Sequence, residues 1–341
     1  ETSKNWCSMG KITPPSQTPI ARTSSRGQLS IGRSGSISSR SSSSSSLFDL
    51  PVTLVLWCHT HTCKYLCGYL LSRGHNLRVV VPPLSGAIEE LSGFEYAITT
   101  MPTTQFEQKK LFKGVDKIIV STDNGPVMDE LLPRKAELIE KYKTDQLEHI
   151  VFLSNGGEFD DEFDLNYYLC DIYIKYKKLL ESIGIPLTCI STHGTHITRA
   201  RFFAQTFSQL KTFVYPAVPV KTQSVDESDL SEIIERILDE GKPHYDKVYS
   251  LVNREEIDPK YLLASIGEAL GEEVLAQEIP IDLYIETLQA MPGMSTEWIE
   301  AVRVILTDER SYVSSSDVKD LLGREPRNFH DWAQENAHLF L

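Results

Sequence analysis

Short apolar runs alternate with longer amphipathic stretches from residue 52 to about residue 250. The runs are rich in Val, Ile and Leu at consecutive positions, which is typical of strands buried on both faces of a parallel sheet. The stretches between them repeat apolar residues every three or four positions, as amphipathic helices do. The pattern predicts an α/β fold, a doubly wound parallel sheet. Expected strands are 52–57, 77–82, 117–122, 149–155, 187–192 and 248–252; expected helices are 62–73, about 104–112, 127–143, 165–183 and 226–240.

After about residue 215 the pattern changes, and after residue 252 it predicts mainly helices, which are interrupted at Pro280, Pro292 and Pro326. A smaller, mostly helical C-terminal lobe is therefore expected beside the sheet. The domain prediction is a tail over 1–48, the sheet domain over 49–252 and the helical lobe over 253–341.

The tail is rich in Ser, Arg, Thr, Gly and Pro and ends in RSSSSSS at residues 40–46. It has too few apolar residues to offset the entropy of ordering, so disorder is expected. An Arg- and Ser-rich, acid-poor N-terminus also resembles an organelle transit peptide, which would direct the protein to a plastid or mitochondrion. A flexible tail on a cytoplasmic protein is the alternative. The basic residues are Lys4, Lys11, Arg22, Arg26, Arg33 and Arg40, against one acid, Glu1.

The overall charge and composition exclude several classes of protein. The formal charge of −13 over 341 residues argues against an extended nucleic-acid-binding face. The six cysteines are too scattered for a disulfide scaffold. No apolar run reaches the roughly 18 residues that a membrane span requires. The sequence therefore predicts a large globular protein that does not span a membrane.

The segment CHTHTC contains Cys58, His59, His61 and Cys63 within six residues, and Cys67 follows one helical turn later. Imidazole and thiolate are good zinc ligands, so this segment is a candidate metal site. However, a structural zinc site takes converging ligands, commonly with a distant second pair, whereas adjacent residues in one strand-to-helix turn point apart. The prediction is that no metal binds, with these four residues kept as the alternative.

Six phrases, in order, resemble the NmrA-like proteins, a branch of the atypical short-chain dehydrogenase/reductases with an NAD(P)-binding Rossmann fold. They cover most of the chain from about residue 52 to residue 340. The phrases are LLSRGHNLRVVV (70–81), LFKGVDKIIVST (111–122), LEHIVFLSNGG (147–157), LLESIGIPLTCI (179–190), SVDESDLSEIIERIL (224–238) and LLGREPRNFHDWAQENA (321–337).

The resemblance implies a glycine fingerprint, GxxGxxG, between the first strand and first helix. Its glycines permit a tight turn and let backbone N–H groups approach a pyrophosphate. In this chain the three positions fall on Trp57, Thr60 and Cys63. Members that prefer NADP place Arg after the second strand, whereas Pro82 and Pro83 follow it here. The fingerprint is therefore degenerate.

The position at which many relatives keep a catalytic Lys or His falls on Tyr173. Lys177 completes a YxxxK pattern with Tyr173, but it lies one turn too far along the helix to hold a nicotinamide ribose in the usual way. The "RPG" that follows the family's fifth strand is Ser191-Thr192-His193 here. No catalytic residue is expected; Tyr173 and Lys177 are the pair if the protein is active.

These departures predict a pseudo-enzyme that binds no cofactor and acts as a regulatory, structural or complex-assembly subunit with a protein partner. Glycines, Arg and Lys each address a different part of one dinucleotide, so their joint loss disfavours hydride transfer. The alternative is an oxidoreductase or redox sensor that binds NADP or NAD through an unusual turn. Thr60, Thr122, Ser154 and Asn155 would then line the cofactor at the carboxyl ends of the strands.

Overall fold

The computed structural model describes residues 50–58, 60–81, 91, 97–122, 128–154, 168–200, 212–218, 223–253, 255, 257–271, 273–290, 296–307 and 315–340. The expected tail over 1–48 lies outside them. No helix in the described part of the chain combines the length and hydropathy that a membrane span needs.

Seven parallel strands form one sheet in the order β3-β2-β1-β4-β5-β6-β8. The predicted doubly wound α/β fold is confirmed, and the predicted strands lie within about two residues of those observed. The order reverses between β1 and β4, and doubly wound sheets bind ligands outside the carboxyl ends of their strands at such a point. The strands are β1 (Val52–Leu56), β2 (Asn76–Val81), β3 (Ile98–Thr100), β4 (Lys117–Ser121), β5 (His149–Ser154), β6 (Leu187–Ser191) and β8 (Val248–Ser250).

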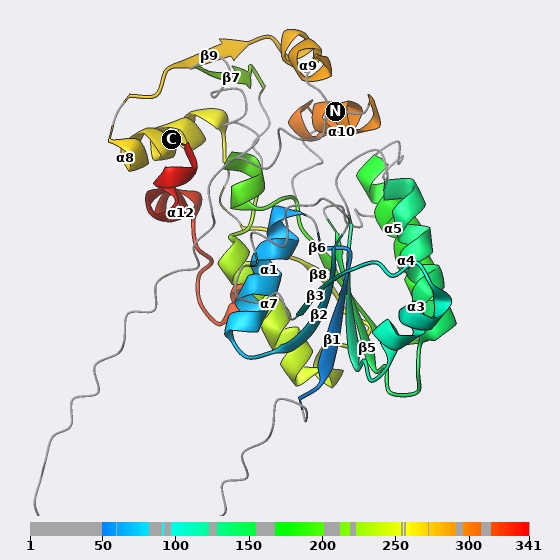
Figure 1. Ribbon diagram of the computed structural model, residues 1–341. Helices are drawn as coiled ribbons and strands as arrows, with labels where there is room; N and C mark the ends of the chain where they lie inside the picture. The colour runs from blue at the N-terminus through cyan, green and yellow to red at the C-terminus, as the bar shows by residue number, and fades with distance from the viewer. Residues whose placement is uncertain are drawn as a thin grey trace, which may run out of the picture.

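Helices cover both faces of the sheet (Figure 1). On one face, α1 (His61–Ser72) packs beside α7 (Glu227–Glu240) over one apolar core. On the other, α3 (Gln105–Phe112), α4 (Met128–Tyr142) and α5 (Tyr168–Glu181) enclose a second core. Consecutive side chains of a strand point to opposite faces, so each apolar strand contributes side chains to both cores. The turn after β1 lies between them.

The helix starts follow capping rules. Thr60, Thr104 and Asp226 precede α1, α3 and α7, and each side chain accepts a hydrogen bond from a backbone N–H in the first turn of its helix. Such caps satisfy donors that have no partner within the helix.

The C-terminal lobe contains a strand pair that the sequence pattern did not predict. β7 (Phe213–Pro216) pairs in parallel with β9 (Ala276–Ile279), so the lobe takes a strand from before residue 253. The lobe also packs back onto the sheet domain, because α11 (Asp317–Leu322) contacts α7; within the lobe, α12 (Phe329–Glu335) lies against α8 (Pro259–Leu270). The remaining elements are the 3-10 helix η4 (Lys242–His244), α9 (Ile281–Gln289), α10 (Thr296–Thr307) and the 3-10 helix η6 (Ala337–Phe340).

Candidate functional site

Trp57 occupies the first glycine position of the fingerprint and adopts a left-handed backbone conformation, with φ of 69°. An L-residue other than glycine pays about 1 kcal/mol or more for that conformation. The indole is half-buried and packs against the core beneath α3, α4 and α5. The turn thus keeps the backbone shape that glycine favours, although it carries the largest side chain.

Thr60 occupies the second glycine position and is the N-cap of α1. Its Oγ1 accepts a hydrogen bond from the backbone N of Cys63, at 3.2 Å. The first-turn N–H groups of a helix are the donors that bind phosphate at this point of a dinucleotide-binding domain. One of these donors is therefore satisfied within the protein.

Thr62, in the first turn of α1, is also hydrogen-bonded within the protein. Thr62 Oγ1 lies 3.1 Å from the hydroxyl of Thr195, which follows β6. Thr195 in turn lies 3.0 Å from the hydroxyl of Thr198. This chain of hydroxyl contacts links the first turn of α1 to the segment after β6, across the edge where a cofactor would lie.

Cys63 occupies the third glycine position and is fully buried together with Cys58 and Cys67. The three sulfur atoms lie within 4.8 Å of one another, and the sulfurs of Cys58 and Cys67 are 3.6 Å apart. Burial raises the pKa of the Cys58 thiol well above its ordinary value. The structure therefore groups the cysteines by core packing, and this group differs from the four-residue cluster suggested by the sequence: His61 lies outside it, and His59 lies outside the described residues.

The residues expected to line a cofactor at the strand ends are largely buried. The backbone N of Thr122 donates to the carbonyl of Leu153, and the carbonyl of Ser154 accepts from the backbone N of Thr192. These bonds continue the sheet pairing one residue beyond the strands. Asn155, the remaining expected residue, lies outside the described part of the chain.

Tyr173 is fully buried in the core between β5 and α5, where its ring stacks on Phe152 with 5.8 Å between ring centroids. Lys177 is half-buried one helical turn further along α5. A proton donor in catalysis must reach its substrate. The burial of Tyr173 therefore argues against the Tyr173–Lys177 pair as catalytic groups and in favour of a packing role for the tyrosine.

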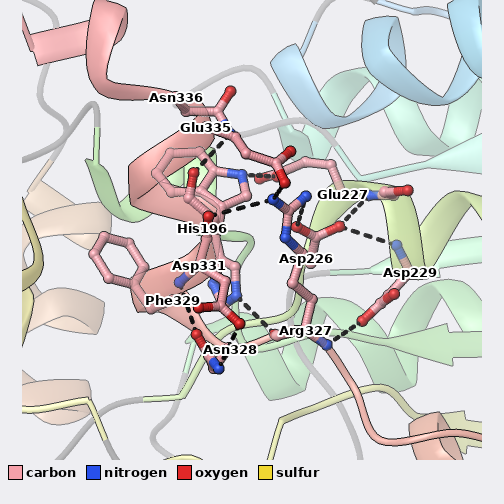
Figure 2. Close-up of polar contacts among 12 residues, drawn as sticks. His196, Asp226, Glu227, Asp229, Arg327, Asn328, Phe329, Asp331, Glu335 and Asn336 are labelled. Atoms are coloured by element: carbon pink, nitrogen blue, oxygen red, sulfur yellow. Dashed lines mark hydrogen bonds and ion pairs between the residues drawn. The ribbon is translucent and has the colours of Figure 1, made fainter. Parts of the chain in front are cut away.

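A buried polar cluster, which the sequence analysis did not identify, joins the start of α7 to the C-terminal segment (Figure 2). Glu227 accepts hydrogen bonds from the backbone N of Ile197 and, at 2.9 Å, from the indole Nε1 of Trp332. His196 Nδ1 lies 2.7 Å from the hydroxyl of Ser224. The phrases SVDESD and LLGREPRNFHDW contain most of this cluster, but their contact depends on the tertiary fold.

Burial perturbs the titration of this cluster. Desolvation raises the pKa of Glu227 to about 8 and that of Asp226 to about 6, the latter also through the nearby Asp229. Desolvation lowers the pKa of His196 to about 3. Perturbed groups of this kind often mark functional sites, but they also occur in structural networks. Here the surroundings favour the structural role, because Glu227 accepts hydrogen bonds from Trp332 of the C-terminal segment and from Ile197 after β6 and thereby joins the two segments.

Two arginines of the C-terminal segment complete the cluster. Arg324 pairs with Asp229 at 2.8 Å and with Glu232 at 2.6 Å. Arg327 lies 3.7 Å from Asp226 and pairs with Glu335 at 2.5 Å, while its backbone N donates to Asp229. The segment LLGREPR thus anchors the end of the chain to α7.

No protein-family model matches the sequence, and no curated protein sequence does either. Comparison with solved structures gives many matches. The fold is similar to a nucleoside-diphosphate-sugar epimerase from Staphylococcus aureus, with a TM-score of 0.65 and 15% identity over 84% of this chain and 100% of that one.

Two further matches have different described activities. An NADPH-dependent quinone oxidoreductase from Escherichia coli, in complex with NADPH, has a TM-score of 0.62 and 14% identity over 84% of this chain and 99% of its own. NmrA, a negative transcriptional regulator, has a TM-score of 0.57 and 15% identity over 84% of this chain and 95% of its own. The chain has the α/β Rossmann-like fold that these proteins share. This shared architecture confirms, at the level of the fold, the resemblance drawn from the six phrases, and the matched proteins include both a regulator and a reductase.

Proposed function

We propose that this protein is a cofactor-degenerate pseudo-enzyme on an NmrA-like fold, which acts as a regulatory, structural or complex-assembly subunit. The observation that carries the proposal is the state of the turn after β1. All three positions where a dinucleotide-binding turn needs glycine hold side chains, and those of Trp57 and Cys63 pack into the two cores while that of Thr60 caps the helix.

The residues present do not fit a nicotinamide dinucleotide. A pyrophosphate at α1 would have to replace Thr60 as the partner of the Cys63 N–H and approach a turn that already carries an indole and a hydroxyl. The second strand is followed by Pro82 and Pro83, which supply neither a charge nor a backbone N–H for a 2′-phosphate. We therefore derive no hydride-transfer step.

The alternative is an NADPH-dependent reductase or a redox sensor. It is favoured by the left-handed φ of Trp57, which keeps the shape of the phosphate-binding turn, and by the NADPH complex of the Escherichia coli quinone oxidoreductase of the same fold. The proposed function and the alternative predict different affinities of the purified protein for NADPH.

Calorimetric titration of the purified protein with NADPH and with NADH tests the proposal. We expect no saturable heat up to millimolar dinucleotide, whereas the Escherichia coli quinone oxidoreductase, the positive control, binds NADPH. A matched variant with Trp57→Gly, Thr60→Gly and Cys63→Gly restores the glycine pattern and measures how much of the loss the three side chains cause. Saturable micromolar binding by the unaltered protein would establish the alternative.

The assembly role needs its own test. The size of the tagged full chain is measured by gel filtration of a native extract and compared with that of the purified 38.5 kDa chain. We expect a larger species in the extract. Phe106, which is 79% exposed in the first turn of α3, is a candidate contact, and Phe106→Ser would then reduce that species. A chain of the same size in both samples would contradict the assembly role.

Organelle targeting by the tail is a further proposal. Localisation of the full chain, with and without residues 1–48, would test it.

A further inference from the structure

The three buried cysteines lie at one place in the fold, although they are spread over ten residues of sequence. Cys58 follows the end of β1, while Cys63 and Cys67 are four residues apart and therefore share one face of α1. That face is turned toward the sheet, and apolar residues that include Val55, Leu66 and Leu70 belong to the same core. All three side chains have no solvent exposure.

The spacing of the sulfur atoms fits a metal ion better than a disulfide. A metal ion held by three thiolates at about 2.3 Å in a plane places the sulfurs about 4 Å apart. The sulfurs here lie within 4.8 Å of one another, and those of Cys58 and Cys67 are 3.6 Å apart. A disulfide would need that pair to approach to about 2 Å. Only small movements separate the observed group from a trigonal site.

The nature of the ligands selects the metal. The group contains three thiols and, among the described residues, no imidazole or carboxylate within the same distance limit. Zinc sites in proteins are almost always four-coordinate, whereas soft thiolates in an apolar site select Cu(I). We propose that Cys58, Cys63 and Cys67 bind one Cu(I) ion through three thiolates.

The position of the site in the fold gives a metal ion access to it. Cys63 lies in the first turn of α1. Thr60 and His61, which lie in the same turn, are half-exposed, so the site is close to solvent at the carboxyl edge of the sheet. Binding of one Cu(I) to three thiols releases three protons to solvent, leaves a net charge of −2 on the three-thiolate site and changes no oxidation state. The site shares Cys63 with the degenerate glycine fingerprint, but copper retention and NADPH affinity are measured in separate experiments.

The test is anaerobic titration of the reduced full chain with Cu(I) in competition with a chromophoric Cu(I) chelator. We expect one equivalent to be retained, with a thiolate-to-copper charge-transfer absorption. Cys58→Ser and Cys67→Ser should each weaken binding by about 100-fold, in the range for loss of a metal-site group. Cys189→Ser is the matched control, since Cys189 is a buried cysteine in the core on the other face of the sheet. Circular dichroism checks that each variant is folded.

X-ray absorption of the copper-loaded wild type gives a readout that does not depend on folding of the variants. Three sulfur neighbours and no nitrogen neighbour are expected. A nitrogen ligand would overturn the three-thiolate site, because it would bring in a histidine such as His59 or His61. Retention of Zn(II) without Cu(I), no retained copper, or an equal loss in Cys189→Ser would also overturn the proposal.

Discussion

The buried hydrogen bond between Trp332 and Glu227 leads to a quantitative prediction about what holds the C-terminal lobe to the sheet domain. Trp332→Phe keeps an aromatic ring beside Phe329 and His196 but removes the indole N–H that lies 2.9 Å from Glu227 Oε2. A buried acceptor that loses its donor costs about 1 to 3 kcal/mol, and the smaller ring loses packing worth about 1 kcal/mol. We expect the free energy of unfolding to fall by about 2 to 4 kcal/mol, measured by urea denaturation at neutral pH.

A double-mutant cycle isolates the hydrogen bond from the packing. Glu227→Gln leaves one acceptor oxygen for two donors, the indole of Trp332 and the backbone N of Ile197, and turns an amide N–H₂ toward the other donor. Removing the indole N–H in that background relieves a donor–donor contact. Trp332→Phe should therefore cost at least about 1 kcal/mol less there than in the wild type.

The pH dependence of stability tests the same carboxyl group. The folded pKa of Glu227, raised by burial to about 8, exceeds its ordinary value of 4.5, so its contribution is full below pH 4.5 and is lost as the pH rises to 8. His196 acts in the opposite direction, between its folded pKa of about 3 and its ordinary 6.5. Between pH 6.5 and 8 Glu227 is therefore the member of this pair that titrates, and stability should fall by about 2 kcal/mol.

Glu227→Gln should abolish that fall. An unfolding free energy that is equally flat from pH 6.5 to 8 in the wild type and in Glu227→Gln would refute the reasoning. A decrease of less than about 0.5 kcal/mol in the free energy of unfolding of Trp332→Phe would also refute it, because the contact would then contribute no more than an ordinary surface residue.

Three further predictions concern the other parts of the structure. Thr60→Ala should lower the free energy of unfolding by about 1 kcal/mol through loss of the α1 cap, while Thr60→Ser keeps most of it; thermal unfolding compares the two. Tyr173→Ala should cost about 3 to 5 kcal/mol in urea denaturation, as for a buried aromatic, whereas a solvated residue would cost little. His196→Asn should make the unfolding free energy fall more steeply as the pH rises from about 4.5 to 6.5. It removes an imidazole that stays neutral in the folded wild type but is protonated in the unfolded chain, and it leaves the opposing titration of Glu227; an unchanged slope would exclude His196 as a contributor.

Six of the seven strands of the main sheet were predictable from the sequence, because most of them are continuous apolar runs whose burial on both faces leaves a local signature. The edge strand β3 was not predicted, because it is three residues long and largely exposed. The strand pair β7–β9 was not, because FVYP and AQEI are four residues long, and AQEI is largely exposed. Such strands are defined by pairing with a partner far along the chain. The prolines of the lobe indicated where its helices are interrupted, but nothing in the sequence indicated that the lobe packs against α7.

The candidate site was predictable in part. The three substituted glycine positions could be identified from the sequence, and the structure places Trp57 and Thr60 in the turn between β1 and α1 and Cys63 in the first turn of α1. The proximity of Cys63 and Cys67 follows from helical periodicity, a signal that was present in their spacing, whereas Cys58 joins them through the packing of α1 on the sheet. Glu227 could not be recognised as buried, because an acidic residue at a helix start is normally solvated and its partner Trp332 lies 105 residues away.

The claim that no dinucleotide reaches the turn after β1 is tested most directly by the backbone amide resonances of residues 57–63. NADPH is titrated to millimolar concentration into isotope-labelled protein, and the resonances of Thr60, His61, Thr62 and Cys63 are followed. The Cys63 N–H, already bonded to Thr60 Oγ1, should not move. A saturable shift of these amides, which is the signature of a phosphate at the start of α1, would contradict the account.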